Sequence, residues 1–230
     1  MKRLIHIENN NAVNSGRDKM KDKIELLAPA GSMESLKAAV LNGGDAVYLG
    51  GYKFGARHYA SNFTIDELKE AIQFCHNYNV KVFVTVNTLI HNREIKEFLD
   101  YMYTLYELDV DAVIVQDLGA LKLIKEYLPD FEIHSSTQMT IHNLQGIEFL
   151  KEIGLTRAVL AREMSIEEIS EIKFKSDMEL EVFIHGALCM CYSGQCLMSS
   201  LIGGRSGNRG KCAQPCRLKY KLIDLKDENK

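Results

Sequence analysis

The chain has 230 residues, of which 46% are hydrophobic and 26% charged, as in an ordinary globular protein. Its formal net charge of −3 excludes a global electrostatic attraction to nucleic acid. No apolar run approaches the roughly 18 residues of a membrane-spanning helix, and the first 23 residues hold no apolar segment of the secretory kind. We therefore expect a cytoplasmic protein in which residues 1–23, which are polar and rich in Asn, form a flexible extension.

Short β-branched runs alternate with helical patterns between residues 24 and 186. The predicted strands are 24–30, 46–50, 81–87, 112–117, 131–136, 157–162 and 180–186. Two of the intervening helices open on capping boxes, Thr64 with Glu67 and Ser165 with Glu168. Strands that are apolar on both faces and alternate with helices indicate a parallel sheet covered by helices.

Seven such units favour an α/β fold of the (β/α)8 TIM-barrel type, with a doubly wound sheet as the alternative. A complete barrel takes about 250 residues. We therefore expect the eighth strand to be missing or to begin near 218–225, so that residues 218–230 start a further strand before the chain is cut off. On this interpretation the chain is the N-terminal part of a longer protein, and the barrel is closed by residues outside it.

Polar side chains stand at the carboxyl ends of the predicted strands. Asn87, Gln138, Arg162 and His185 each follow or end such a strand. Because chemistry in TIM barrels takes place at this end of the strands, we expect these side chains to surround an active-site mouth.

Five of the six cysteines lie in 187–217, which has neither a helical nor a strand period and is predicted to be a loop. The sixth, Cys75, falls on the apolar face of a predicted helix and is expected in the core. The five are Cys189, Cys191, Cys196, Cys212 and Cys216. Nothing marks the chain for export, and clustered cysteines inside cells more often bind metal or catalyse than form disulfides.

Three chemistries remain open for this loop. Cys189 or Ser193 is a candidate nucleophile with His185 as its base, although this would leave most of the cysteines unexplained. Zinc is a second interpretation, but the spacing lacks the tight pairs of structural zinc sites. An iron–sulfur cluster tolerates wider spacing because it is larger than one ion.

A basic run accompanies the cysteines, and no Asp or Glu occurs from 182 to 223. Its members are Arg205, Arg209, Lys211, Arg217, Lys219 and Lys221. The run can balance the charge of a thiolate-bound cluster, with Arg205 and Arg209 as the candidate cofactor-binding residues, or it can hold the phosphates of an RNA.

The stretch EVFIHGALCMCYSGQCLMSS and the following GRSGNRGKCAQPCR closely resemble the signature of peptidase family U32, the collagenase-like group. ELLAPAGS, GGDAVYLGG, VFVTVNT and HSSTQMT also resemble that family, so the resemblance covers roughly 24–223. It implies a TIM-barrel-like domain. It also implies either a peptidase or an oxygen-independent hydroxylase, since members of the group hydroxylate a tRNA uridine, a ribosomal RNA cytidine or a ubiquinone precursor.

The resemblance implies a [4Fe-4S] cluster with Cys189, Cys196 and Cys212 as its first three ligands. The family's fourth ligand lies beyond residue 230, and Cys216 is the candidate substitute. Cys191 stands where many members carry a small residue, so we interpret it as a bystander.

Prephenate is the oxygen donor that the resemblance implies, and a cluster enzyme also needs an electron donor and iron–sulfur assembly proteins. We predict that Asn87, Gln138, Arg162 and His185 form the donor pocket, with Arg162 on a donor carboxylate because its planar fork matches that geometry. The alternative for Arg162 is a salt bridge with Glu163 or Asp117. A non-catalytic domain that binds zinc and RNA is a further hypothesis.

Overall fold

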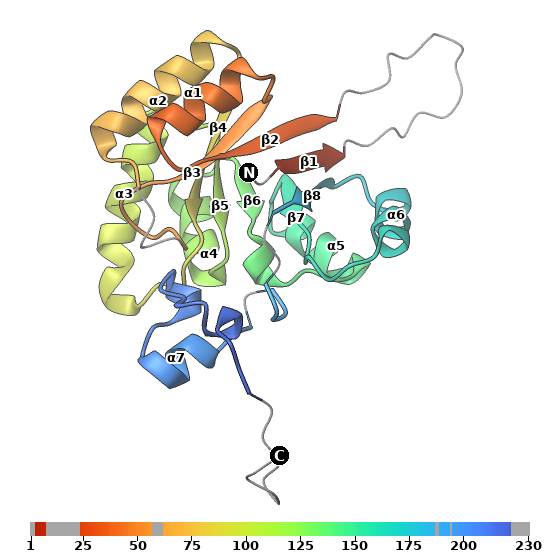
Figure 1. Ribbon diagram of the computed structural model, residues 1–230. Helices are drawn as coiled ribbons and strands as arrows, with labels where there is room; N and C mark the ends of the chain where they lie inside the picture. The colour runs from red at the N-terminus through yellow and green to blue at the C-terminus, as the bar shows by residue number, and fades with distance from the viewer. Residues whose placement is uncertain (1–2, 8–23, 57–61, 187–188, 194, 222–230) are drawn as a thin grey trace, which may run out of the picture.

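A computed structural model describes residues 3–7, 24–56, 62–186, 189–193 and 195–221. Eight strands form a closed barrel in which each strand pairs with its neighbour in the sequence, and β1 also pairs with β8 (Figure 1). The strands β2 to β8 run parallel, as the sequence predicts, whereas β1 is antiparallel to both of its neighbours. The α/β barrel prediction is therefore confirmed.

The element bounds follow the predicted alternation closely. The strands are β1 (Arg3–Ile7), β2 (Glu25–Ala30), β3 (Ala46–Gly50), β4 (Lys81–Val86), β5 (Ala112–Val115), β6 (Ile133–Ser135), β7 (Arg157–Val159) and β8 (Glu179–His185). The α-helices are α1 (Met33–Leu41), α2 (Ile65–Asn77), α3 (Ile95–Glu107), α4 (Leu118–Tyr127), α5 (Leu144–Glu152), α6 (Ile166–Lys175) and α7 (Met198–Gly203). Short 3-10 helices are η1 (Asn92–Glu94), η2 (Thr137–Met139), η3 (Gly207–Arg209) and η4 (Pro215–Arg217).

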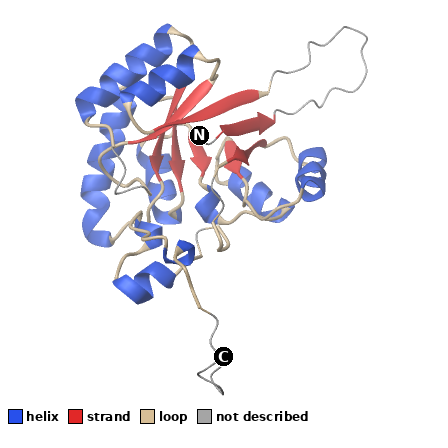
Figure 2. Cartoon of the chain, viewed as in Figure 1, coloured by secondary structure: helices blue, strands red, loops and turns tan. Residues whose placement is uncertain are grey.

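The helices α1 to α6 lie outside the barrel and bury their apolar faces against it (Figure 2). Both predicted capping boxes are present, at Thr64 with Glu67 and at Ser165 with Glu168. Cys75 is fully buried in the core on α2, as expected, and burial raises the pKa of its thiol to about 12. Among the described helices, none combines the length and the apolar character needed to cross a membrane.

The two ends of the chain depart from the sequence-based expectations. Residues 3–7 were expected in a flexible extension but form β1, which lies between the first and last parallel strands. The barrel is thus closed from the N-terminal side, because β1 satisfies the strand edges that β2 and β8 would otherwise expose. The described residues 218–221 are not in a strand, and the rest of the further strand predicted over 218–230 lies outside the described residues.

The cysteine-rich segment is also more ordered than predicted. It was expected to lack helices, yet it contains α7, η3 and η4. Figure 1 shows α7 beyond the carboxyl ends of the barrel strands. The segment therefore covers the mouth of the barrel.

The amino end of the barrel is sealed by a buried ion-pair network. Arg157 is 1% exposed and donates from Nη1 to Glu25 Oε1 at 2.7 Å and from Nε to Glu179 Oε2 at 3.0 Å. Its Nη1 also lies 3.6 Å from Glu181 Oε2, and its guanidinium lies over the ring of Phe83. The side chains of this network fill the amino end of the barrel, and the cavity lies at the carboxyl end.

Candidate active site at the barrel mouth

A cavity of about 480 Å³ opens at the carboxyl ends of the strands. The structure brings together there all four side chains predicted for the pocket and three of the cysteines predicted as ligands. These are Asn87, Gln138, Arg162, His185, Cys189, Cys196 and Cys212. Residues up to 125 positions apart in the sequence thus share one site, although the role of each in the site stays a prediction.

Ser136 contacts the side chain of Asn87 and the backbone of Gln138 in the cavity. Asn87 Oδ1 accepts from the backbone N–H of Ala56 at 2.9 Å, and its Nδ2 donates to Ser136 Oγ at 3.3 Å. Ser136 Oγ also accepts from the backbone N–H of Gln138 at 3.2 Å, where η2 begins. Gln138 Oε1 is buried without a hydrogen-bond partner among the described residues, so this acceptor is not satisfied by the surrounding protein.

Arg162 is held at its Nε and not by the carboxylates considered as its partners. Its Nε donates to Ser193 Oγ at 3.1 Å. Asp117 instead caps α4 and accepts from the backbone of Ile90, and Glu163 accepts from Ser193. Within the described residues the two Nη groups have no hydrogen-bond partner, so this face of the fork is available to an anion in the cavity.

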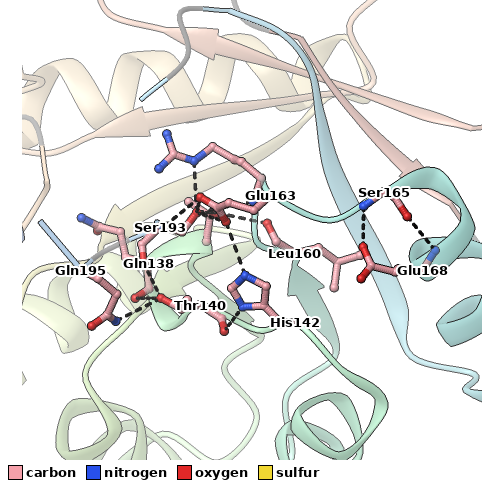
Figure 3. Close-up of polar contacts among 11 residues, drawn as sticks. Gln138, Thr140, His142, Leu160, Glu163, Ser165, Glu168, Ser193 and Gln195 are labelled. Carbon is pink, nitrogen blue, oxygen red and sulfur yellow. Dashed lines mark hydrogen bonds and ion pairs between the residues drawn. The ribbon is translucent and has the colours of Figure 1, made fainter. Parts of the chain in front are cut away.

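Ser193 is placed as a structural residue and not as a nucleophile. It is 0% exposed, and its Oγ lies within hydrogen-bond distance of Glu163, Arg162 and Thr137 (Figure 3). A substrate cannot reach this oxygen. The nearby imidazole, His142, lies 3.6 Å from Glu163 and does not contact Ser193 in the described structure. Among the described residues, Ser193 has no hydrogen bond to His185, and its burial argues against the predicted pairing of the two.

His185, at the end of β8, is exposed and shares the cavity lining with Cys189, which is also exposed. The same cavity contains the ring of Tyr192 and the aromatic side chains of Tyr48 and Phe183 deeper in the barrel. A flat, partly polar ligand has both stacking partners and hydrogen-bond partners in such a lining.

The five loop cysteines divide differently from the prediction. Cys216 is exposed and does not line the cavity. Cys191, interpreted as a bystander, lies against two predicted ligands: desolvation and the thiols of Cys196 and Cys189 raise its pKa. Among the described residues, no three His, Cys, Asp or Glu side chains are arranged around one metal ion.

The two arginines predicted to bind a cofactor do not line the cavity. Arg209 Nη2 lies 2.6 Å from Glu94 Oε1, and Nη1 donates to Oε2 at 2.8 Å. This fixes the loop to the barrel rim beside α3, and Arg205 donates from Nε to the carbonyl oxygen of Lys211 at 3.2 Å within the loop. Arg209 is therefore an anchor of the loop, and this correction could not be made from sequence because Glu94 is 115 residues away.

Comparison with known families now adds to this geometry. Residues 31–230 match the model described as peptidase family U32. The chain belongs to this family. A U32 peptidase of known structure superposes with a TM-score of 0.59 at 14% identity, over 73% of this chain and 71% of that chain, which supports the shared fold.

Three curated relatives illustrate the range of the U32 family. The chain is 43% identical to a tRNA hydroxylation protein of Bacillus subtilis over 94% of its own length and 51% of the relative. It is 46% identical to a 23S rRNA 5-hydroxycytidine synthase of Escherichia coli, over 88% of this chain and 30% of that one. It is 35% identical to a collagenase of Porphyromonas gingivalis, over 87% and 50%. The chain thus spans about half or less of the length of these relatives.

Proposed function

We propose that the protein is an iron–sulfur-dependent, oxygen-independent hydroxylase, or an accessory protein of one, that acts on a base of tRNA or ribosomal RNA. The observation that carries this proposal is the meeting of Cys189, Cys196 and Cys212 with Arg162 and His185 in one cavity. Relatives of this chain are named for tRNA and rRNA hydroxylation, which agrees with it.

The three cysteines of the cavity lining support a cluster, because thiolates are its usual ligands. Cys216, or a residue outside this chain, would be the fourth ligand. A bound [4Fe-4S] cluster would supply electrons or polarise the oxygen donor in this cavity. An electron donor and iron–sulfur assembly proteins are the partners that such an enzyme requires.

The protein's own residues would bind and orient the oxygen donor. Prephenate carries carboxylates, and the two Nη groups of Arg162, which have no hydrogen-bond partner among the described residues, would match one of them in a two-point contact. Asn87 is already oriented by Ala56 and Ser136, so it can donate or accept without rearrangement. His185 is the exposed imidazole of the lining and can hold or release a proton beside the reacting atoms.

An RNA base must leave its stack to enter a cavity at the barrel mouth, and aromatic side chains commonly receive such a base. Tyr192 is 63% exposed and lines the cavity, so it is placed to stack on an entering base. Lys211, Arg217 and Lys219 are exposed on the same loop and would contact phosphates. RNA binding should therefore weaken steeply with salt.

The metal and sulfide content of anaerobically purified protein tests the proposal. We expect iron and sulfide in equal amounts with absorbance near ~400 nm, typical of thiolate-bound clusters, and loss of both in Cys196→Ala. Cys216→Ser separates the two candidates for the fourth ligand, since the cluster survives if that ligand lies outside this chain. Zinc without sulfide would instead support a metal-binding domain without this chemistry.

A peptidase is the second candidate, favoured by the shared exposure of Cys189 and His185 in one cavity. Its nucleophile would be Cys189, because Ser193 is buried. Gelatin cleavage by metal-free protein, abolished in Cys189→Ala, would support it over the hydroxylase.

A further inference from the structure

We propose that Ser193 and Glu163 are positioning residues that set the orientation of Arg162 and the path of the cysteine loop together. This deepens the proposed function, because both Arg162 and the loop belong to the proposed site. Ser193 lies between Cys191 and Cys196 in the sequence, and Glu163 follows Arg162 directly. One contact between two segments can therefore act on both parts of the cavity.

The direction of each hydrogen bond at Ser193 follows from chemistry. A carboxylate only accepts, so the single O–H of Ser193 is donated to Glu163, whose two oxygens lie 3.2 and 3.3 Å from Oγ. The backbone N–H of Ser193 also donates to Glu163, at 2.9 Å. The lone pairs of Oγ then accept from Arg162, from its Nε at 3.1 Å and from its backbone N–H at 3.4 Å. The O–H of Thr137 is donated to the carbonyl oxygen of Leu160 at 3.1 Å.

This arrangement lets Glu163 act on Arg162 through a neutral hydroxyl. The carboxylate polarises the Ser193 O–H, and the more negative Oγ binds the Nε–H of Arg162 more strongly. The hydrogen bond at Nε fixes the plane of the guanidinium. A ligand that binds both Nη groups therefore loses less affinity to the entropic cost of ordering this side chain. A direct ion pair with Glu163 would instead have occupied the Nη groups.

The backbone of the loop is also fixed at Ser193, by contacts with Thr140. Thr140 Oγ1 donates to the carbonyl oxygen of Ser193, and Gln195 Nε2 donates to Thr140 Oγ1 at 3.2 Å (Figure 3). Thr140 has a φ of 60°, so the chain turns sharply at the end of η2 to meet the loop. Cys191 and Cys196, on either side of this contact, take their places from it.

Glu163→Gln and Ser193→Ala test the inference in the full chain, purified under reducing conditions. Glu168→Gln is the matched control, because Glu168 also accepts a backbone N–H, that of Ser165 at 2.7 Å, on the same rim but without touching the loop. The first measurement is the alkylation rate of each cysteine by iodoacetamide, resolved by mass spectrometry. The second is the Kd for malonate, a small dicarboxylate probe.

We expect both test variants to change the alkylation rates of Cys191 and Cys196 at least about threefold and to weaken malonate binding about fivefold or more, the scale of one charge-assisted hydrogen bond. The control should change neither. Rates and affinity like those of Glu168→Gln, with only a lower melting temperature, would overturn the proposal. Absence of malonate binding in the wild type would overturn its Arg162 part.

If Ser193→Ala does not fold, the isosteric Glu163→Gln still decides the question. Neither measurement uses hydroxylation or bound iron. A protein without cluster or RNA activity would therefore contradict the proposed function and leave the positioning result standing.

Discussion

Arg209 and Glu94 form a two-point ion pair that fastens the cysteine-rich loop to the barrel, with N–O distances of 2.6 and 2.8 Å. The arginine also donates to the carbonyl oxygen of Leu89, beside Asn208, whose carbonyl accepts from Gln116 Nε2 at 3.2 Å. The loop is thus also held beside the segments that follow β4 and β5.

The Arg209–Glu94 pair should make loop docking sensitive to acid. The hydrogen bond from Arg209 lowers the pKa of Glu94 from its ordinary 4.5 to about 2, although partial burial opposes the shift. A lowered folded-state pKa contributes stability that is present above about pH 4.5 and is lost as the pH falls towards about 2. We expect Glu94→Gln to lower the free energy of unfolding by roughly 0.5–1 kcal/mol at neutral pH. The variant should also lose less stability than wild type as the pH falls from about 4.5 to about 2.

Urea unfolding as a function of pH measures this effect. Glu171→Gln is the control, since Glu171 pairs with Lys175 on the exposed face of α6, away from the loop. If the free energy of unfolding of Glu94→Gln fell with acid as steeply as that of wild type, the pair would not contribute to stability.

Gly210 is a second contact that should not tolerate a side chain. Its φ is 74°, and a Cβ there would lie 2.8 Å from backbone atoms of Gly55 and Ala56. We expect Gly210→Ala to cost about 1–2 kcal/mol for the left-handed conformation, and more because the clash is with backbone. Limited proteolysis should cut the loop faster in this variant.

Gly203→Ala is the matched substitution in the same loop. Gly203 ends α7 and has no atom within 4 Å of the position that a Cβ would take. It should be neutral or slightly stabilising. Equal proteolysis of the two variants would show that the Gly210 contact does not hold the loop.

Glu181 should make the barrel less stable above neutral pH. It is 1% exposed, its carboxylate oxygens have no hydrogen-bond partner among the described residues, and burial raises its pKa to about 7 although Arg157 opposes this. A raised folded-state pKa contributes stability that is full below about pH 4.5 and is lost as the pH rises through about 7. In Glu181→Gln, stability should no longer fall as the pH rises through this range.

Thermal unfolding between about pH 5 and about pH 8.5 tests the Glu181 prediction, the window set by linkage. Glu179→Gln is the comparison, because Glu179 contacts the same Arg157 but is 37% exposed at its side chain, and it should keep the slope. A slope that persists in Glu181→Gln would assign it to another group.

Arg162 should determine the affinity of the site for a carboxylate donor. Replacement by Lys keeps the charge but loses the planar fork, so we expect prephenate binding to weaken about tenfold, and further in Arg162→Met. Calorimetry measures both. Arg93→Lys, at an exposed position on η1 outside the cavity lining, should bind as wild type does. Equal affinity in Arg162→Lys would place the donor carboxylate elsewhere.

Most of the barrel could be predicted from the sequence because its evidence is local. The run AVYLG becomes β3 over the predicted residues, and the capping boxes at Thr64 and Ser165 begin helices as expected. The strand ends then place Asn87 and His185 at one mouth, since parallel strands share a direction. The resemblance to the U32 signature, and not the spacing alone, implied that Cys189, Cys196 and Cys212 belong together, and all three line the cavity.

The remaining features depend on contacts between segments far apart in the chain. Residues 3–7 are a strand because β2 and β8 offer them two open edges, and nothing in RLIHI by itself indicates that pairing. Ser193 could have been a nucleophile or a buried hydroxyl, and only its approach to Glu163 decides this. Periodicity and spacing thus determined the elements and the edge where the site lies, whereas the tertiary structure decided which polar groups bond to one another and which remain available, because hydrogen bonds depend on distances that sequence separation does not set.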